Sequence, residues 1–393
     1  MPLPRTPSDR MRVGINLLTD DPNNPSGAHW FWTRVIPEMA TMLTADEELV
    51  LLTSPKSRPL HDSYRGNIRH FTLPWSNEKR SLRTLSEHSL VPFKLRKAGI
   101  TQFNTLMAPL IGSVPVVAHI KTLHAYTAPA SISPPARLYR RLSYPRTARV
   151  ADIVILNSES LRREVQRYLD IDPAKLRLIP EAVDHELFRP GDRGEAQAWL
   201  RDRYDIDDPF VLFVSSLWPY KNCAGLMRAF AAAKDELEGR KLVVVGPGRD
   251  SDHAAELRAL AAELGITDDV LLVGGVPLAD TVNFYRAADV FVYPSFNETF
   301  GLPILEAMAC GCPVVTSDIS AMPETAGGAA LLADPNDVES IANAVVKACG
   351  PEGERLRQLG LDRAGEFTWA RTAERTLAVY REVHARHSGG PRR

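Results

Sequence analysis

Two glutamates, Glu298 and Glu306, have the types and spacing in this chain that most clearly predict chemistry. Between them lies Phe300-Gly301-Leu302-Pro303. Pro303 suits the first turn of a helix, because its missing N–H and its fixed φ cost nothing there. Gly301 lets the backbone come close to a ligand. The pattern predicts a loop that carries Glu298, then a helix with Glu306 about one turn from its start.

The start of this helix is a predicted anion site. Free backbone N–H groups of Phe300, Gly301 and Leu302, together with the positive end of the helix dipole, favour a phosphate. Two carboxylates fit beside an anion site if one faces sugar hydroxyls and the other faces a developing positive charge. A nucleoside diphosphate sugar presents phosphates, hydroxyls and an anomeric carbon that becomes cationic. Residue types alone leave a plainer alternative, a helix with two solvated glutamates.

The elements around this stretch alternate strand and helix. Val290 to Tyr293 is an apolar strand that leads into the loop, and Gly311 is placed to end the helix in a left-handed conformation. Val314 to Thr316 forms the next strand. A strand, a loop with polar residues and a helix is the repeating unit of doubly wound α/β domains, which bind ligands at the carboxyl ends of their strands.

Ser295 to Ser317 closely resembles the signature of retaining glycosyltransferase family 4, also called glycosyl transferases group 1. The matching residues are Glu298-x7-Glu306, the Phe-Gly-Leu-Pro between them, and Glu-Ala-Met-Ala-Cys-Gly-Cys-Pro-Val-Val from Glu306 to Val315. The resemblance extends from Met11 to His387, specific in the second half and looser in the first. It implies the GT-B arrangement, an α/β fold of two doubly wound Rossmann-like domains that face a cleft. The domains implied are an acceptor-side domain at 11–190, a nucleotide-sugar-binding domain at 205–368, and a helix at 369–388 that packs back on the first domain.

The resemblance also implies a donor site in the second domain. Ser215 to Asn222 corresponds to the diphosphate loop, in which Lys221 is a flexible point charge suited to a phosphate. The family often has an arginine where Ser216 or Tyr220 stands. One cation is therefore missing here, and phosphate binding must rely on Lys221 and on backbone N–H donors. The donor-binding residues implied are Gly27, Ser216, Lys221, Val276, Asn297, Phe300, Gly301, Leu302 and Glu306.

The roles implied are those of a hexosyltransferase that retains anomeric configuration. Glu306 accepts hydrogen bonds from the ribose, while Lys221 and the helix N–H groups neutralise the leaving diphosphate. Glu298 lies beside the donor sugar, and His124 reaches that sugar from the other domain. The catalytic residues implied are therefore Glu298, His124 and Lys221.

The first domain offers weaker matches. His124 follows a predicted strand at Val114 to Ile120, as a histidine does in the family, but Ala125 stands where an aspartate is usual. His119 is the competing position, and a structural role is the alternative for either. Gly27 matches the first glycine loop, with a plain turn glycine as its alternative.

Five arginines between Arg137 and Arg149 predict a solvated helix face. The alternative is an acceptor surface for an anionic lipid carrier or a phosphorylated sugar.

Substrates and partners are less defined. Pro219-x-Lys221-Asn222 resembles members that use GDP-mannose, while UDP-sugars stay open, and the acceptor is a glycan, a lipid-linked molecule or a small molecule. A nucleotide-sugar hydrolase or epimerase and a degenerate binding protein are the alternative functions. No cluster of Asp or His is spaced as a metal site, so we expect no cofactor and no metal, the nucleotide sugar being a substrate.

Composition adds the setting. The net charge of −1 over 393 residues produces no overall electrostatic attraction to nucleic acid or to a membrane surface. We therefore expect no nucleic-acid partner and at most peripheral membrane contact. The oligomeric state is open. The four cysteines are few, and Cys310-Gly-Cys312 has no partner residues for zinc nearby. Met1 to Arg10 has no apolar segment typical of a signal peptide. Reduced thiols and a cytoplasmic setting are the expectation.

Overall fold

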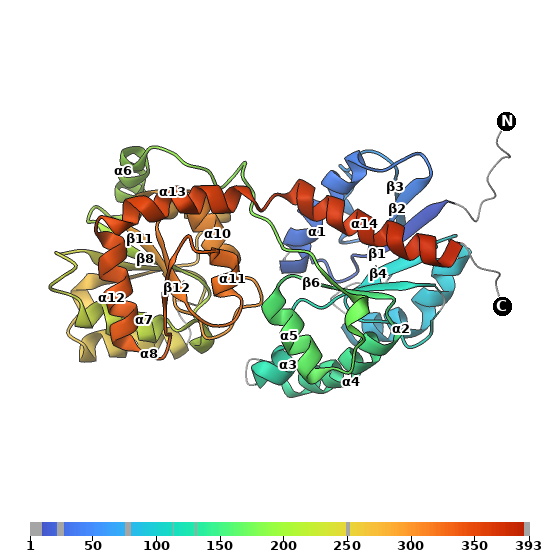
Figure 1. Cartoon of the computed structure of the whole chain (residues 1–393), viewed down its shortest axis with the longest axis horizontal. Coiled ribbons are helices and arrows are strands. Elements are labelled where there is room, and N and C mark those ends of the chain that lie inside the picture. The colour runs from blue at the N-terminus through green and yellow to red at the C-terminus, as the bar shows by residue number, and fades with distance from the viewer. Residues whose placement is uncertain are drawn as a thin grey trace. The chain divides into compact units, whose positions relative to one another are not determined.

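Two parallel sheets, each with its own hydrophobic core, organise the chain in the computed structural model (Figure 1). The structure describes residues 10–21, 27–74, 80–112, 114–129, 132–248 and 252–388. Unit 1 contains the residues up to Pro180 and those from Trp369 onward, and unit 2 runs from Glu181 to Thr368. The segment from Met1 to Arg10 lies outside the described residues, except for Arg10.

The sheet of unit 1 has the order β3-β2-β1-β4-β5-β6-β7, and all neighbouring strands are parallel. Its strands are β1 (Met11–Asn16), β2 (Glu47–Thr53), β3 (Ile68–Thr72), β4 (Gln102–Thr105), β5 (Val116–His119), β6 (Ile153–Leu156) and β7 (Leu176–Leu178). The direction of strand addition reverses between β1 and β4, which makes this edge the topological switch point of the sheet.

Helices cover both faces of this sheet, as runs of apolar residues in parallel strands require. They are α1 (Gly27–Thr41), α2 (Arg80–Lys97), α3 (His124–Thr127), α4 (Pro134–Val150), α5 (Glu159–Tyr168) and α14 (Trp369–Ser388), with short 3-10 turns η1 (Arg58–Leu60) and η4 (Pro173–Lys175). Leu49 and Leu51 of β2 pack with α1 and α14, while Val50 and Leu52 pack with α2 on the opposite face. The alternation of side chains along β2 thus separates two cores.

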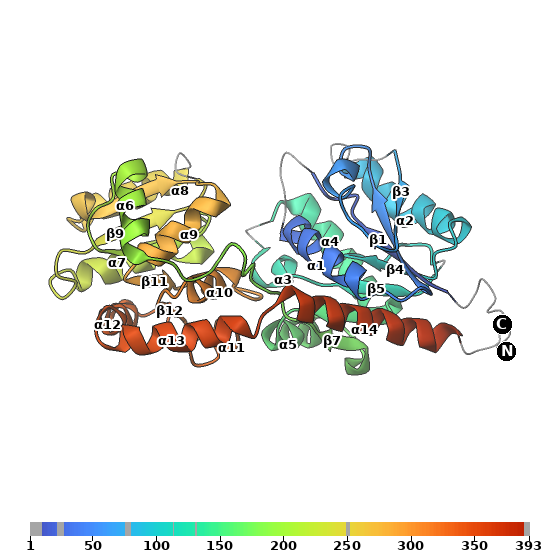
Figure 2. The ribbon, with the colours of Figure 1, turned by 90° about the horizontal axis from the view of Figure 1, so that it is seen from above.

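Helix α14 returns from unit 2 and runs beside α1 (Figures 1 and 2). Its apolar face contributes Leu377, Tyr380 and Val383 to the core of unit 1. Gln102 of β4 donates to the backbone carbonyl of Tyr380 at 2.9 Å. Arg381 pairs with Glu47 of β2 at 2.7 Å and holds the pKa of that carboxyl below its usual value. Hydrophobic burial and two polar contacts together fix the helix against the sheet.

The sheet of unit 2 has the order β10-β9-β8-β11-β12-β13, again parallel throughout. Its strands are β8 (Phe210–Val214), β9 (Lys241–Val245), β10 (Val270–Gly274), β11 (Val290–Tyr293), β12 (Val314–Ser317) and β13 (Leu331–Ala333). One face carries α6 (Arg193–Tyr204), α9 (Leu278–Ala287), α10 (Leu302–Ala309) and α11 (Met322–Ala326). The other carries α7 (Cys223–Ala232), α8 (Asp252–Glu263) and α12 (Val338–Cys349), and α13 (Glu352–Gly365) contributes to both cores. The short 3-10 turns are η5 (Pro219–Lys221) and η6 (Thr267–Asp269).

The switch point of unit 2 lies between β8 and β11, which are direct neighbours in the sheet. The loops that follow these two strands therefore emerge side by side at the carboxyl edge. They are the segments with Lys221 and with Glu298. The two sheets confirm the predicted α/β class with two Rossmann-like domains. Among the helices of the described residues, none is long and apolar enough to cross a membrane.

Leu377→Ala tests the docking of α14. Leu377 is fully buried between α14 and the sheet of unit 1, so its truncation leaves a cavity and should lower the free energy of unfolding of unit 1 by about 2–5 kcal/mol. Urea unfolding followed by circular dichroism measures the change. Arg375→Ala, on the exposed face of the same helix, is the matched control. Equal unfolding midpoints for the two variants would contradict this packing.

Candidate functional site

An ion pair between Lys221 and Glu298 lies at the centre of the candidate site in unit 2. Lys221 ends the 3-10 turn η5, which follows β8, and Glu298 lies in the loop after β11. The ammonium Nζ is 2.6 Å from Glu298 Oε1, and the two side chains are only 11% and 13% exposed. Two residues that stand far apart in the sequence are thus brought together, with opposite charges largely shielded from water.

Tyr293, the last residue of β11, completes this cluster, and the sequence analysis missed it. Lys221 Nζ donates to its hydroxyl oxygen at 2.7 Å, and that hydroxyl donates to Glu298 Oε1 at 2.8 Å. Burial, with the carboxylate of Glu298 nearby, raises the pKa of Tyr293 well above its ordinary value. Its position at the carboxyl end of a buried strand is the signal that could have identified it, because a buried tyrosine needs a partner for its hydroxyl.

Asn222 fixes the loop that carries Lys221. It has a left-handed backbone with a φ of 59° and caps the start of α7, where its side chain accepts from the N–H of Gly225. Its amide donates to the carbonyls of Pro294, at 3.0 Å, and Pro335, at 2.8 Å. One side chain therefore ties the loop after β8 to the loops after β11 and β13.

Gly246 reinforces the start of the same loop. Its φ is 152°, and a Cβ atom there would lie 1.8 Å from the carbonyl oxygen of Ser215. No other residue type fits so close an approach of the turn after β9 to the loop after β8.

Ser320 holds the loop that carries Glu298. Its backbone is left-handed, with a φ of 61°, although it is not glycine. Its hydroxyl accepts from the N–H of Glu298 at 3.1 Å and lies 2.6 Å from the carbonyl of that residue. It is also 3.1 Å from Oδ1 of Asn297. A strained residue that is held by several contacts is a common feature of functional sites.

Helix α10 starts directly after this loop with open backbone donors. Gly301 precedes it with a φ of 93°, and no side chain caps the helix. Within the described residues, the N–H groups of Phe300, Gly301 and Leu302 donate to no protein atom. The carbonyl of Phe300 accepts from the hydroxyl of Thr325, which anchors the turn. This arrangement can bind an anion.

Glu306 lies one turn into α10 and faces α9. The hydroxyl of Tyr285 donates to Glu306 Oε2 at 3.0 Å. Burial raises the pKa of Glu306 to about 7, and the hydrogen bond from Tyr285 opposes this rise. Near neutral pH the carboxyl is therefore divided between its two forms, and a ligand that donates a hydrogen bond favours the ionised form.

Two other residues predicted for the donor site lie in loops of unit 2. Ser216 belongs to the loop after β8, where its carbonyl accepts from the N–H of Trp218 at 2.8 Å. Val276 follows β10 and packs partly buried against the core.

Two further candidates, Gly27 and His124, belong to unit 1. Gly27 opens α1, and none of the described residues lies within 4 Å of its Cβ position. His124 begins α3, where its N–H donates to the hydroxyl of Thr122. His119 is a core residue. It is almost fully buried against Phe31 and Trp32, no partner is found for either ring nitrogen among the described residues, and burial lowers its pKa.

Part of the arginine-rich segment has a structural role. Arg141 donates to the carbonyl of Ala125 at 3.1 Å, and Arg146 donates to the carbonyls of Pro109 and Leu110 at 2.7 and 2.6 Å. These bonds attach α4 to α3 and to the segment after β4. The sequence predicted a solvated helix face, but Arg141 and Arg146 bind backbone carbonyls instead of pointing only into solvent.

Comparison with known proteins identifies the family. The model of glycosyl transferases group 1 matches residues 200–359, and that of Glycosyltransferase Family 4 matches residues 33–187. A D-inositol 3-phosphate glycosyltransferase of Kribbella flavida is 32% identical over 297 residues, which are 72% of this chain and 68% of that protein. The chain belongs to the group 1 glycosyltransferases of family 4.

The chain covers less than two thirds of the length of two further relatives. The D-inositol 3-phosphate glycosyltransferase of Stackebrandtia nassauensis is 35% identical over 297 residues, 72% of this chain and 65% of that protein. For the protein of the same description from Acidothermus cellulolyticus, the chain covers 62% of the length at 33% identity over 287 residues, 70% of this chain.

Solved structures support the GT-B fold of the family. Sucrose-phosphate synthase of Thermosynechococcus elongatus aligns with a TM-score of 0.73 at 22% identity, over 96% of this chain and all of that one. Anabaena Alr3699/HepE, in complex with UDP and glucose, aligns with a TM-score of 0.70 at 19% identity, over 95% of this chain and all of that one. At such identities the likeness concerns the fold alone.

Glu306→Gln tests the raised pKa of Glu306. A carboxyl whose pKa rises from 4.5 in the unfolded chain to about 7 favours folding while it is protonated, so its contribution is present below pH 4.5 and is lost as the pH rises through 7. The amide keeps an acceptor for Tyr285 without a charge. At pH 8 the variant should therefore be more stable than the natural chain by roughly 1–3 kcal/mol, and at pH 4.5 the difference should vanish.

Denaturant unfolding at a series of pH values measures this difference. Glu236→Gln, at an exposed turn of the same unit, should follow the natural chain at every pH. The same pH slope for Glu306→Gln and the natural chain would contradict the raised pKa.

Proposed function

We propose that this chain is a retaining hexosyltransferase that moves a sugar from a nucleoside diphosphate sugar to an acceptor. The observation that carries the proposal is the Lys221–Tyr293–Glu298 cluster, which precedes the uncapped start of α10. It combines a cation, a carboxylate and open backbone donors at the carboxyl edge of the sheet of unit 2. These are the groups that a diphosphate and a sugar with a developing positive charge require.

Lys221 and the start of α10 stabilise the leaving diphosphate in this proposal. An ammonium group has three N–H donors, and two of those of Lys221 bind Tyr293 and Glu298. The third is available for a phosphate oxygen without loss of the ion pair. The N–H groups of Gly301 and Leu302 complete the anion site, and they compensate for the arginine that the family often has at Ser216 or Tyr220.

The two glutamates have different tasks. Glu298 is held by Lys221 and Tyr293 as a fixed carboxylate beside the donor sugar, where it binds a hydroxyl and favours positive charge at the anomeric carbon. Glu306 accepts hydrogen bonds from the ribose hydroxyls with the oxygens that Tyr285 leaves available. Asn297 and Phe300 flank Glu298 in the loop before α10, and Val276 borders the nucleobase.

Unit 1 supplies the acceptor side. We assign to His124 a contact with the donor sugar, and to Gly27 a close approach of backbone to the donor phosphates. Both roles rest on the family resemblance, and they require the two units to close on the substrates.

Two observations favour different donors. The Pro219-x-Lys221-Asn222 loop favours GDP-mannose, whereas the HepE structure with UDP and glucose favours a UDP-sugar. The curated relatives act, by their description, on D-inositol 3-phosphate. A phosphorylated polyol is therefore the first acceptor to try, before glycans and lipid-linked sugars.

We propose that transfer needs no metal ion at the diphosphate. Lys221 and the N–H groups of α10 supply the positive charge that Mg²⁺ would otherwise provide.

A thermal-shift panel of UDP-, GDP-, ADP- and dTDP-sugars tests the donor site. Ligand that binds only the folded protein raises the unfolding midpoint according to its occupancy. One nucleotide class should produce a clear shift, and the shift should be the same with and without Mg²⁺. No shift with any nucleotide would contradict the donor site. If one nucleotide sugar binds, analysis of the products formed from it separates transfer from hydrolysis.

Variants of the two glutamates separate their roles. Glu298→Gln removes the charge beside the sugar, so kcat should fall about 100-fold or more while nucleotide affinity changes little. Glu306→Ala removes the acceptor for the ribose, so KM for the donor should rise about 10-fold or more with a smaller change in kcat. Steady-state kinetics with the nucleotide sugar from the panel measures both effects.

Glu339→Gln, exposed on α12 of the same unit, is the control and should keep both constants. Full activity of both site variants would contradict the assignment. The anomeric configuration of the product, read by NMR, should equal that of the donor.

A further inference from the structure

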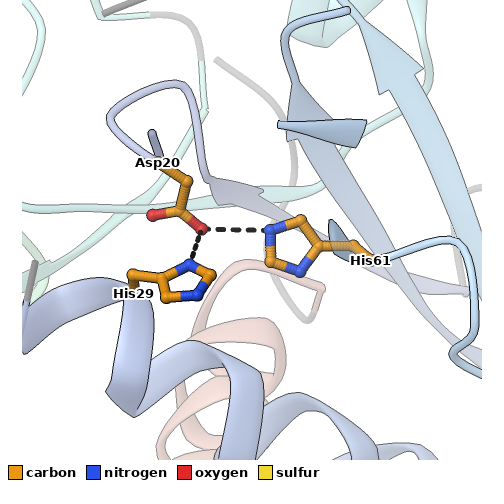
Figure 3. Close-up of side chains that lie close together, drawn as sticks. All are labelled: Asp20, His29 and His61. Carbon is orange, nitrogen blue, oxygen red and sulfur yellow. Dashed lines mark hydrogen bonds and ion pairs between the residues drawn. The ribbon is translucent and has the colours of Figure 1, made fainter. Parts of the chain in front are cut away.

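Asp20, His29 and His61 form a compact group in unit 1 that the function proposed above does not use (Figure 3). Asp20 lies in the segment after β1, His29 in the first turn of α1, and His61 directly after η1. Because β1 and β2 are adjacent parallel strands, the segments that follow them meet at one edge of the sheet. The three residues are 2%, 8% and 0% exposed.

The distances in this group suit a metal ion. Asp20 Oδ2 is 3.0 Å from His61 Nε2 and 3.3 Å from His29 Nδ1. The three potential ligand atoms all lie within 4.8 Å of one another. With zinc bonds of about 2.0–2.1 Å, the ligand atoms of a tetrahedral site are about 3.4 Å apart. The two distances from Asp20 Oδ2 are already close to this value.

The carboxylate of Asp20 is only partly hydrogen-bonded by the described residues. Both of its hydrogen bonds end on Oδ2, while Oδ1 is buried with no partner among the described residues. An ionised carboxylate offers about four acceptor positions, and a buried charge is costly unless it is paired. A divalent cation beside Oδ1 and Oδ2 would pair with this carboxylate.

A second contact orients His61 as a ligand. Its Nδ1 is 3.1 Å from the hydroxyl oxygen of Tyr64. With the proton on Nδ1 donated to Tyr64, the lone pair of Nε2 points into the group. Metal-binding histidines are commonly held in this way by a partner on the other ring nitrogen. The opposite tautomer, with Nε2–H donated to Asp20, is the state of a purely hydrogen-bonded group.

We propose that Asp20, His29 and His61 bind a divalent transition-metal ion such as Zn²⁺. Two imidazoles and one carboxylate form a ligand set that zinc accepts, with a further position for water or another oxygen ligand. The ion ties the segment after β1 to the start of α1 and to the segment after β2, at the carboxyl edge of the sheet. Its residues belong to unit 1, whereas Lys221 and Glu298 belong to unit 2, and it does not depend on the glycosyltransferase proposal.

Zinc binding to the full chain tests the proposal. Protein freed of metal with a chelator is titrated with Zn²⁺ by calorimetry, and the bound metal is counted by mass spectrometry after gel filtration. The natural chain should bind one zinc and unfold at a higher temperature with it, because the ion binds the folded state. Asp20→Asn and His61→Gln should lose that zinc.

His253→Gln is the matched control, since it removes a histidine that pairs with Glu256 at 2.8 Å, where the described residues offer no third ligand. It should bind zinc as the natural chain does. A natural chain that binds no zinc, or an Asp20→Asn variant that binds it equally well, would overturn the proposal and leave a hydrogen-bonded group only.

A spectrum of the natural chain with Co²⁺ keeps the test decisive if the variants fail to fold. Nitrogen and oxygen ligands should produce visible cobalt absorption without the near-ultraviolet band of a cobalt–thiolate bond. A thiolate band would place the metal at cysteine and overturn the proposal.

Discussion

The ion pair of Lys221 and Glu298 is the interaction on which the candidate site depends. Removing two charges from water costs free energy, which is recovered only when the pair has further hydrogen bonds. The hydroxyl of Tyr293 provides them, since it accepts from the lysine and donates to the glutamate. The parallel neighbours β8 and β11 bring the two loops to one edge of the sheet, and the charge pair then selects how those loops lie.

The backbone around this pair is held in conformations that few residues adopt. Asn222, Gly246, Gly301 and Ser320 all have a positive φ, and all four lie in loops at the edge where β8, β9, β11 and β12 end. Asn222 and Ser320 offset the cost with side-chain hydrogen bonds to neighbouring loops. The result is a rigid frame in which the donors of α10 stay open for a ligand rather than folding back on the protein.

The two units share an architecture but differ in their chemistry. Unit 2 has its polar groups where β8 and β11 end, with a cation, two carboxylates and an open helix start. Unit 1 has a different set of buried polar groups at the carboxyl edge of its own sheet, namely two histidines and one aspartate. The same fold thus positions different ligand sets, because the strands determine where loops emerge and the loops determine what they bind.

The sequence by itself determined the fold class and predicted where the candidate site lies. Apolar runs that alternate with helical segments specify parallel α/β sheets, and the block from Glu298 to Val315 identifies the family because its glycine, proline and glutamates are needed at fixed local positions. Local spacing is sufficient there, since Gly301 and Glu306 lie within one loop and one helix.

Only the tertiary structure decided which distant residues meet. Tyr293 looks like any residue of a buried strand until its hydroxyl is seen between Lys221 and Glu298, and His119 is revealed as a core residue by its packing on Phe31 and Trp32. The group of Asp20, His29 and His61 has no sequence signature, because three segments separated along the chain supply it. The order of strands in the sheet brings such segments together, and that order depends on long-range packing that local sequence patterns do not encode.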